Sequence, residues 1–239
     1  MSSTLLIRHA QASFATPDYD RLSALGSLQA TLTARYLSVT AGPIARIVCG
    51  PLKRQRATAE PIAAAVRNAA DCRPELLIDP RLDELQIDAC IEQIAPRLPD
   101  PGGELRNLLA KAATVSRSYQ KVIRRVFPEW QKLDDSAGLE SWPAFSARAI
   151  AALRDITGLA GRGETTIVVS SGAIIATITQ QVLGLPDSAC YGLFEAMQNC
   201  SITHLKHTGG RISLSSFNET GFLAAMGQLS GAANLLTYR

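Results

Sequence analysis

The stretch TLLIRHAQASF (residues 4–14) decides how the chain is interpreted, because an apolar, strand-like run in it stops abruptly. The run ends on Arg8 and His9. Burying a cation or an imidazole is costly unless a partner compensates for the lost hydration. These side chains are therefore either solvated at a strand end or placed there to hold an anion, and the rest of the sequence has to separate the two alternatives.

The composition is that of an ordinary globular protein. The chain has 239 residues, 46% of them hydrophobic and 19% charged, and its net charge of +3 is too small to indicate a nucleic-acid partner. Five cysteines without a CxxC pair argue against a disulfide framework or a zinc site, and three histidines exclude a histidine-rich metal site. No basic leader precedes an apolar stretch, and no apolar run approaches the ~20 residues of a membrane span. We therefore expect a cytoplasmic protein with no membrane or nucleic-acid partner.

Strand and helix patterns alternate along most of the chain. Strands are predicted at 4–9, 44–50, 75–79 and 164–171, and helices at 23–39, 56–69, 142–159 and 173–185. This alternation is typical of βαβ units that form a mostly parallel sheet covered on both faces. Two last strands, 201–207 and 211–217, flank a Thr-Gly-Gly turn and predict a hairpin. The expected fold is a three-layer α/β sandwich with a mostly parallel central sheet.

One segment interrupts the rhythm. Residues 80–103 are rich in proline and predict a loop, and residues 104–127 predict one polar helix. We interpret residues 98–140 as a helical insertion or lid, and the whole chain, 1–239, as a single domain.

Unusual side chains follow three of the predicted strands. The first strand ends in Arg8 and His9, the second leads to Arg54 at the start of a helix, and the fourth leads to Ser171 and Gly172 at another. Ligands of doubly wound sheets bind beyond the carboxyl ends of the strands, and free N–H groups at helix starts favour anions. Arginine also binds phosphate through two parallel hydrogen bonds. This pattern predicts a site for a phosphate-sized dianion.

The same edge offers groups for chemistry. His9 either hydrogen-bonds the phosphate or attacks phosphorus, since a neutral imidazole is a competent nucleophile near neutral pH. An attack needs an acid for the leaving oxygen, and Glu84, just after the third strand, is the best candidate, with Asp83 as its competitor. Gln11 and Ser13 follow the histidine and are further candidates for lining the pocket.

Several ordered motifs together resemble one family, the histidine phosphatase superfamily with its phosphoglycerate mutase-like fold. They are LLIRHAQASF…YDRLSALGSLQA, GPLKRQRATAE, RLDE, LESWPAFSARAIAAL and NCSITHL…GGRISLSSFNETGFL. The resemblance covers nearly the whole chain. It implies that His9 is the nucleophile, that Arg8 and Arg54 bind the phosphate, and that Glu84 donates the proton. It also implies that no metal or cofactor is needed.

Two positions depart from the family pattern. Ala10 stands where the family has glycine after the histidine, and Ser171 stands where it has a second histidine. A neutral hydroxyl replaces a cation there, and loss of one transition-state donor typically costs ~10²–10³ in rate.

We therefore expect a metal-independent, histidine acid phosphatase-like phosphomonoesterase that forms a phosphohistidine on His9, with Ser171 and Gly172 completing the anion cradle. The alternatives are mutase-type phosphoryl transfer and a weakly active or inactive phospho-ligand binding or scaffold protein. The expected partner is a small phosphorylated metabolite or a phosphoprotein. The sequence does not select the substrate or the oligomeric state.

Overall fold

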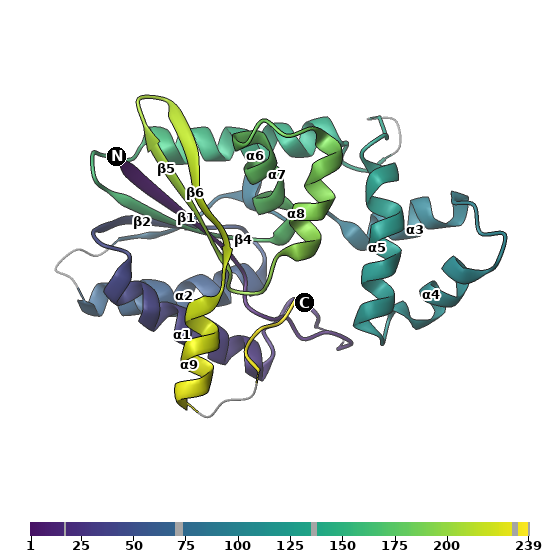
Figure 1. The fold of residues 1–239 in the computed structure, drawn as a ribbon, viewed down its shortest axis with the longest axis horizontal. Coiled ribbons are helices and arrows are strands. Elements are labelled where there is room, and N and C mark those ends of the chain that lie inside the picture. The colour runs from purple at the N-terminus through teal and green to yellow at the C-terminus, as the bar shows by residue number, and fades with distance from the viewer. Residues whose placement is uncertain (17, 70–73, 135–137, 231–233, 239) are drawn as a thin grey trace.

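The sheet is mostly parallel, with an antiparallel hairpin at one edge. The structure, a computed structural model, describes residues 1–16, 18–69, 74–134, 138–230 and 234–238. Within them, six strands form one sheet in the order β3-β2-β4-β1-β5-β6 (Figure 1). The strands are β1 (Ser2–Arg8), β2 (Ile44–Cys49), β3 (Leu76–Ile78), β4 (Thr165–Ser170), β5 (Ile202–Thr208) and β6 (Arg211–Glu219). β1 to β4 run parallel, and β5 is antiparallel to β1 and β6, so the predicted sheet and hairpin are confirmed.

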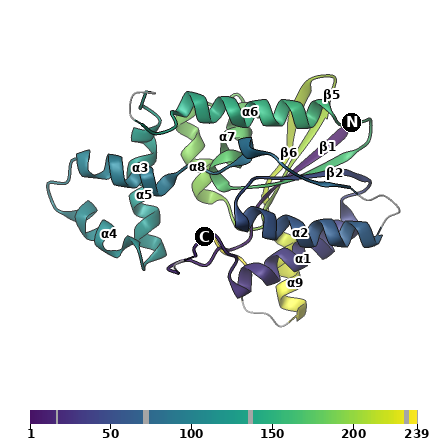
Figure 2. The same ribbon diagram turned by 180° about the vertical axis from the view of Figure 1, so that it is seen from behind.

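Helices cover both faces of this sheet, as Figures 1 and 2 show from opposite sides. One face carries α1 (Ala24–Thr40), α2 (Lys53–Ala69) and α9 (Gly221–Ser230), and the other carries α6 (Trp142–Gly158), α7 (Gly172–Val182) and α8 (Cys190–Ala196). Successive strand residues point to opposite faces, so Ile7 packs with Leu37 and Ile62, whereas Leu6 packs with the cluster around Phe145. Burial on both faces explains why the strands are unbroken apolar runs.

Strand register brings the carboxyl ends together. Arg8 pairs with Ser170 across β1 and β4, Val169 pairs with Cys49 of β2, and Cys49 pairs with Ile78 of β3. The four parallel strands therefore end at one level, and the residues that follow each of them share one edge of the sheet.

A group of helices extends beyond this edge, and it corrects two of our expectations. It contains α3 (Ile87–Ile94), α4 (Glu104–Ala112) and α5 (Ser116–Trp130), with 3₁₀ turns at Pro80–Leu82 and Ala95–Arg97. The segment 80–103 is thus largely helical and not a loop, because Cys90 and Ile94 of α3 lie on one buried face. In place of the expected single helix over 104–127 there are two helices, α4 and α5. The short connection between them contains Val115, whose backbone is extended.

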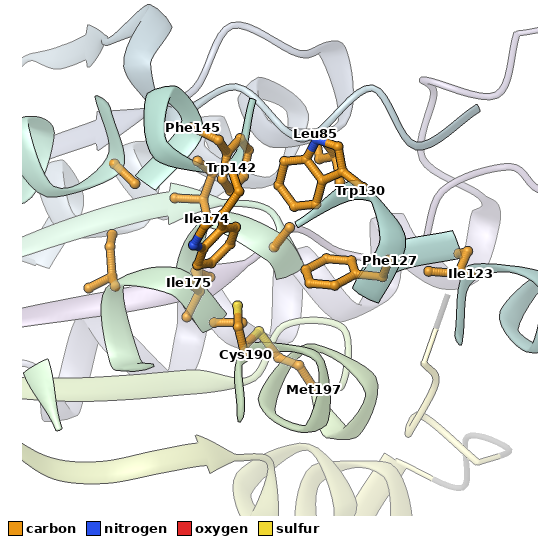
Figure 3. Packing of buried hydrophobic residues seen from close by; sticks show 14 of the residues in the cluster. Leu85, Ile123, Phe127, Trp130, Trp142, Phe145, Ile174, Ile175, Cys190 and Met197 are labelled. Carbon is orange, nitrogen blue, oxygen red and sulfur yellow. The ribbon is translucent and has the colours of Figure 1, made fainter. Parts of the chain in front are cut away.

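The apolar face of α5 is continuous with the main core. Phe127 and Trp130 lie against Trp142 and Phe145 of α6, with ring centroids 5.4 to 6.5 Å apart (Figure 3). The Trp130 indole N–H also donates to the carbonyl of Glu140 at 2.8 Å. Aromatic packing of this kind fixes α5 against the sandwich and makes it part of the wall beside the sheet edge.

The start of α2 also differs from the predicted one. The helix begins at Lys53 and not at residue 56, and Pro61 lies in its interior. The cause is a cap from a distant segment, since the Asp20 carboxylate accepts from the backbone N–H of Lys53 at 2.8 Å and of Arg54 at 3.4 Å. Local sequence patterns do not show such a cap. Throughout the described ranges, no helix combines the length and the hydropathy that crossing a membrane requires.

Candidate active site

His9 is buried at the end of β1, and its protonation state follows from its two partners. Its Nδ1 lies 2.8 Å from the Ala10 carbonyl, which only accepts, so Nδ1 carries the proton. Its Nε2 accepts from Arg54 Nε at 3.1 Å and keeps a lone pair. Burial, followed by the charges of Arg54 and Arg8, holds the pKa of His9 well below 6.5. The imidazole is neutral, oriented and nucleophilic at Nε2.

Two arginines place positive charge near His9. Arg54, in the first turn of α2, makes an ion pair with Asp20 at 2.7 Å, and its guanidinium lies 5.6 Å from the Tyr19 ring centroid. Arg8 donates through Nη1 to the Met197 carbonyl, while its Nε is buried and has no hydrogen-bond partner among the described residues. Burial lowers the pKa of Arg8. A buried, unpaired donor on a cation is poised for an anionic ligand.

Glu84 is the carboxyl group at this edge. One carboxylate oxygen accepts from the backbone N–H of Leu85 at 2.9 Å, and the other accepts from that of Ala173 at 3.3 Å, in the first turn of α7. Burial raises the pKa of Glu84 above its usual 4.5, against the opposing effects of Arg54 and these N–H groups. Asp83 is the other candidate for the acid. Its carboxylate accepts from the backbone N–H of Glu84 at 2.8 Å, and Asp83 does not line the cavity.

Ser171 and Gly172 follow β4 at the same edge of the sheet. Ser171 is fully buried, and its hydroxyl accepts from the Gln55 amide at 2.8 Å and does not cap α7. A Cβ on Gly172 would lie 2.9 Å from the Phe194 ring, so glycine allows α8 to approach closely. Neither Ser171 nor Gly172 is among the described residues that line the cavity. Gln55, which sequence reasoning missed, also donates to the Leu82 carbonyl at 3.1 Å.

Gln11 and Ser13 secure the loop after β1 and do not line the cavity either. The Gln11 side chain accepts from the Ser23 hydroxyl at 2.8 Å, and the backbone N–H of Ser13 donates to the Arg21 carbonyl at 2.7 Å. The approach of this loop to α1 requires Gly26, where a Cβ would lie 2.1 Å from the Gln11 carbonyl oxygen.

A cavity of about 310 Å³ opens onto these groups. Arg8, His9, Arg54 and Glu84, which the sequence predicted, line it together, and the remaining wall comes from Leu85, Gln86, α3, α5, α8, Tyr19 and Tyr238. No motif marks these wall residues, because they meet only through tertiary packing. Over the described part of the chain, no three or more His, Cys, Asp or Glu side chains gather in a way that could hold a metal ion. A neutral nucleophile, two cations and a protonatable carboxyl suit phosphoryl transfer.

Comparison with known families agrees with this geometry. The family model of the histidine phosphatase superfamily (branch 1) matches residues 4–138 and 111–220. The chain belongs to this superfamily. A comparison with curated proteins found no match to this chain.

Solved structures show the same fold at low sequence identity. A phosphoserine phosphatase from Entamoeba histolytica, in complex with 3-phosphoglyceric acid, has a TM-score of 0.63 at 22% identity, covering 93% of this chain and 100% of its own. A phosphoglycerate mutase from Bacillus anthracis reaches 0.64 at 19% identity, covering 93% and 95%. A mycobacterial glucosyl-3-phosphoglycerate phosphatase reaches 0.62 at 20% identity, covering 91% and 99%. The phosphoglycerate mutase-like α/β fold is therefore confirmed.

Proposed function

We propose that this protein is a phosphomonoester phosphatase that works through a phosphohistidine on His9. The supporting observation is a neutral His9 whose Nε2 lone pair faces Arg54, in a cavity that also carries Arg8 and a carboxyl group whose pKa is raised. Family membership points to the same class of activity. The two guanidiniums supply the positive charge that the transferring phosphoryl group needs, so we propose a metal-independent reaction.

The first step is an in-line displacement. Arg54 Nε now donates to the His9 lone pair, so the arriving phosphate must take over this donor before attack. Nε2 then forms a bond to phosphorus as the bond from phosphorus to the leaving oxygen breaks, and Glu84 delivers its proton to that oxygen. Arg8 and Arg54 bind the equatorial oxygens. The products are the free alcohol, a phosphohistidine that keeps its Nδ1 proton on the Ala10 carbonyl, and a Glu84 carboxylate.

The second step reverses the roles. The Glu84 carboxylate takes a proton from a water molecule, the water oxygen attacks phosphorus, and the electron pair of the breaking P–N bond returns to Nε2. Inorganic phosphate leaves, and both His9 and Glu84 regain their starting protonation states. One carboxyl group thus serves as acid and then as base.

Hydrolysis of p-nitrophenyl phosphate in the presence of a chelator tests this proposal. His9→Ala should lower kcat/KM by at least about 10³-fold, because it removes the nucleophile. His204→Ala is the matched control, since His204 lies on β5 with its Nε2 3.0 Å from the Ser3 hydroxyl and away from the cavity. Full activity in His9→Ala would contradict the proposal.

A passive phospho-ligand binding protein is the alternative that Ser171 keeps open. A binding module has no use for a protonatable carboxyl beside a nucleophile, and this observation favours the enzyme. Rapid-quench labelling with a ³²P-phosphomonoester separates the two. The enzyme should show transient, acid-labile label that His9→Ala lacks, whereas a binding protein should show none.

A further inference from the structure

The cavity lining contains two chemically different sets of residues. The phosphate end is formed by Arg8, His9, Arg54 and Glu84. The rest of the lining, the wall, contains the apolar or aromatic side chains Leu85, Ile87, Tyr119, Ile123, Tyr191 and Phe194 together with polar ones such as Gln86 and Gln120. A substrate held by its phosphate at the phosphate end must place its alcohol moiety, the leaving group, against this wall.

The charges around the wall are negative or neutralised. Among the described residues, the cations that line the cavity are Arg8 and Arg54, and both belong to the phosphate end. Asp88 and Glu195 are the acidic side chains on the wall. Asp88 accepts from the Tyr119 hydroxyl at 2.6 Å, and Glu195 is ion-paired with Arg124 on the outer side. A second anionic group on the substrate finds carboxylates and rings along this wall, and the cation beside them, Arg124, is already ion-paired with Glu195.

The wall is also preformed. Phe194 stacks on Phe127 with ring centroids 5.7 Å apart, and Phe127 belongs to the aromatic cluster of the core. Leu85 and Ile123, which line the cavity, lie at the edge of that same cluster in Figure 3. Close-packed side chains do not rearrange cheaply to solvate a charge. A rigid apolar wall therefore selects among leaving groups.

We propose that the substrate is a phosphomonoester whose leaving group carries no negative charge and presents an apolar, ring-sized body to this wall. The inference rests on the proposed phosphatase function and adds the substrate class. A carboxylate in this position would lose its hydration without gaining a counter-ion, which is costly in a partly enclosed site. An uncharged ring instead gains burial and contact with the aromatic side chains.

A matched pair of esters tests the proposal, namely benzyl phosphate and its para-carboxylate. The methylene group insulates the leaving oxygen, so the two alcohols have similar leaving ability and differ mainly in charge. We expect kcat/KM to favour benzyl phosphate by at least about 10-fold, the discrimination that a pocket contact typically supplies. Equal values, or a preference for the carboxylate, would overturn the inference.

A charge introduced on the wall provides the second test. Gln120 lies on α5, lines the cavity and is half-buried, so it accepts a substitution with little risk to the fold. Gln120→Lys should lower the ratio of kcat/KM for benzyl phosphate to kcat/KM for its para-carboxylate by about 10-fold. Most of this change should come from a higher kcat/KM for the carboxylated ester. Gln120→Met, which has similar length and no charge, is the reference for it. A ratio identical in the two variants would overturn the electrostatic basis of the inference.

The outcomes also separate this inference from the proposed function. Hydrolysis of both esters at equal rates, with His9 labelled, leaves the phosphatase intact and removes the leaving-group preference. No turnover of any monoester, together with no label on His9, defeats the proposed function itself.

Discussion

At the scale of single residues, the pKa values of His9 and Glu84 are displaced in opposite directions. The proposed attack requires His9 neutral and Glu84 protonated, and with ordinary pKa values of 6.5 and 4.5 this pair of states would be a minor form at every pH. Burial lowers the first pKa and raises the second. Both shifts favour the pair of protonation states that the proposed mechanism requires.

This argument predicts how Glu84→Gln behaves. kcat/KM should fall on the alkaline side as Glu84 ionises, and on the acid side as His9 becomes protonated. Glu84→Gln should abolish the alkaline fall and lower kcat/KM for benzyl phosphate, which reports the first step alone, by about 10²-fold. For p-nitrophenyl phosphate, whose leaving group needs no proton, kcat/KM should fall much less. Rate profiles against pH on the two esters measure this. Equal losses on both would show that Glu84 is not the acid.

The same substitution should change the pH dependence of stability. The folded-state pKa of Glu84 is raised, so its contribution to stability is present below the unfolded value of 4.5 and is lost as the pH rises towards the folded pKa. The Tm of Glu84→Gln relative to wild type should therefore increase between about pH 4 and about pH 8. Thermal unfolding at both pH values provides the measurement, and a difference that is constant with pH would contradict it.

The residues closest to the chemistry were predictable because they immediately follow strand ends. Arg8 and His9 interrupt an apolar run, and Arg54 starts a helix. The side-chain directions were not predictable. Ser171 directly follows β4, as expected, yet its hydroxyl is bound to Gln55 beneath the cavity. Which way a side chain points at a strand-to-helix turn depends on neighbours that are distant in sequence.

At the scale of elements, the start of α2 is set by a carboxylate from another segment. Asp20 accepts from the backbone N–H of Lys53 and forms an ion pair with Arg54 at 2.7 Å, so one side chain both caps the helix and orients the Arg54 guanidinium. The helix pattern alone placed this start at Arg56. Helix α3 could not be predicted from local patterns either. Its apolar residues span only eight positions, and the proline-rich stretch beside them predicts a loop.

We predict that Asp20→Ala destabilises the fold by about 1–2 kcal/mol, the usual range for losing a helix cap, and raises KM by about 10-fold because Arg54 loses its orientation. Asp18→Ala is the matched control. Its ion pair with Lys53 is exposed, with side-chain exposures of 44% and 67%, and should contribute less than about 0.5 kcal/mol. Denaturant unfolding and steady-state kinetics give both quantities, and similar behaviour of the two variants would refute the dual role of Asp20.

At the scale of the whole molecule, the C-terminal residues complete the site. The Gln29 amide donates to the Leu235 carbonyl at 2.7 Å and to the Thr237 hydroxyl at 2.9 Å. Thr237 in turn donates to Asn199 at 2.9 Å, and Asn199 donates to the His9 carbonyl at 3.1 Å. Tyr238, the next residue, lines the cavity. No local pattern predicts this chain of contacts, because its members lie up to 208 positions apart.

These contacts give the C-terminal residues two separable effects, one on the cavity wall and one on His9. Tyr238→Ala removes a wall side chain and its hydrogen bond from Gln198 and leaves Thr237 in place, so KM for benzyl phosphate should rise several-fold while kcat stays close to wild type. Deletion of residues 235–239 also removes Thr237 from Asn199, so kcat should fall as well, because a loosened His9 spends less time aligned for attack. Steady-state kinetics of the two variants, with thermal unfolding to verify folding, make the comparison. If the deletion lowers kcat no more than Tyr238→Ala does, the link from Thr237 through Asn199 does not orient the nucleophile, and the C-terminal residues act on the cavity wall alone.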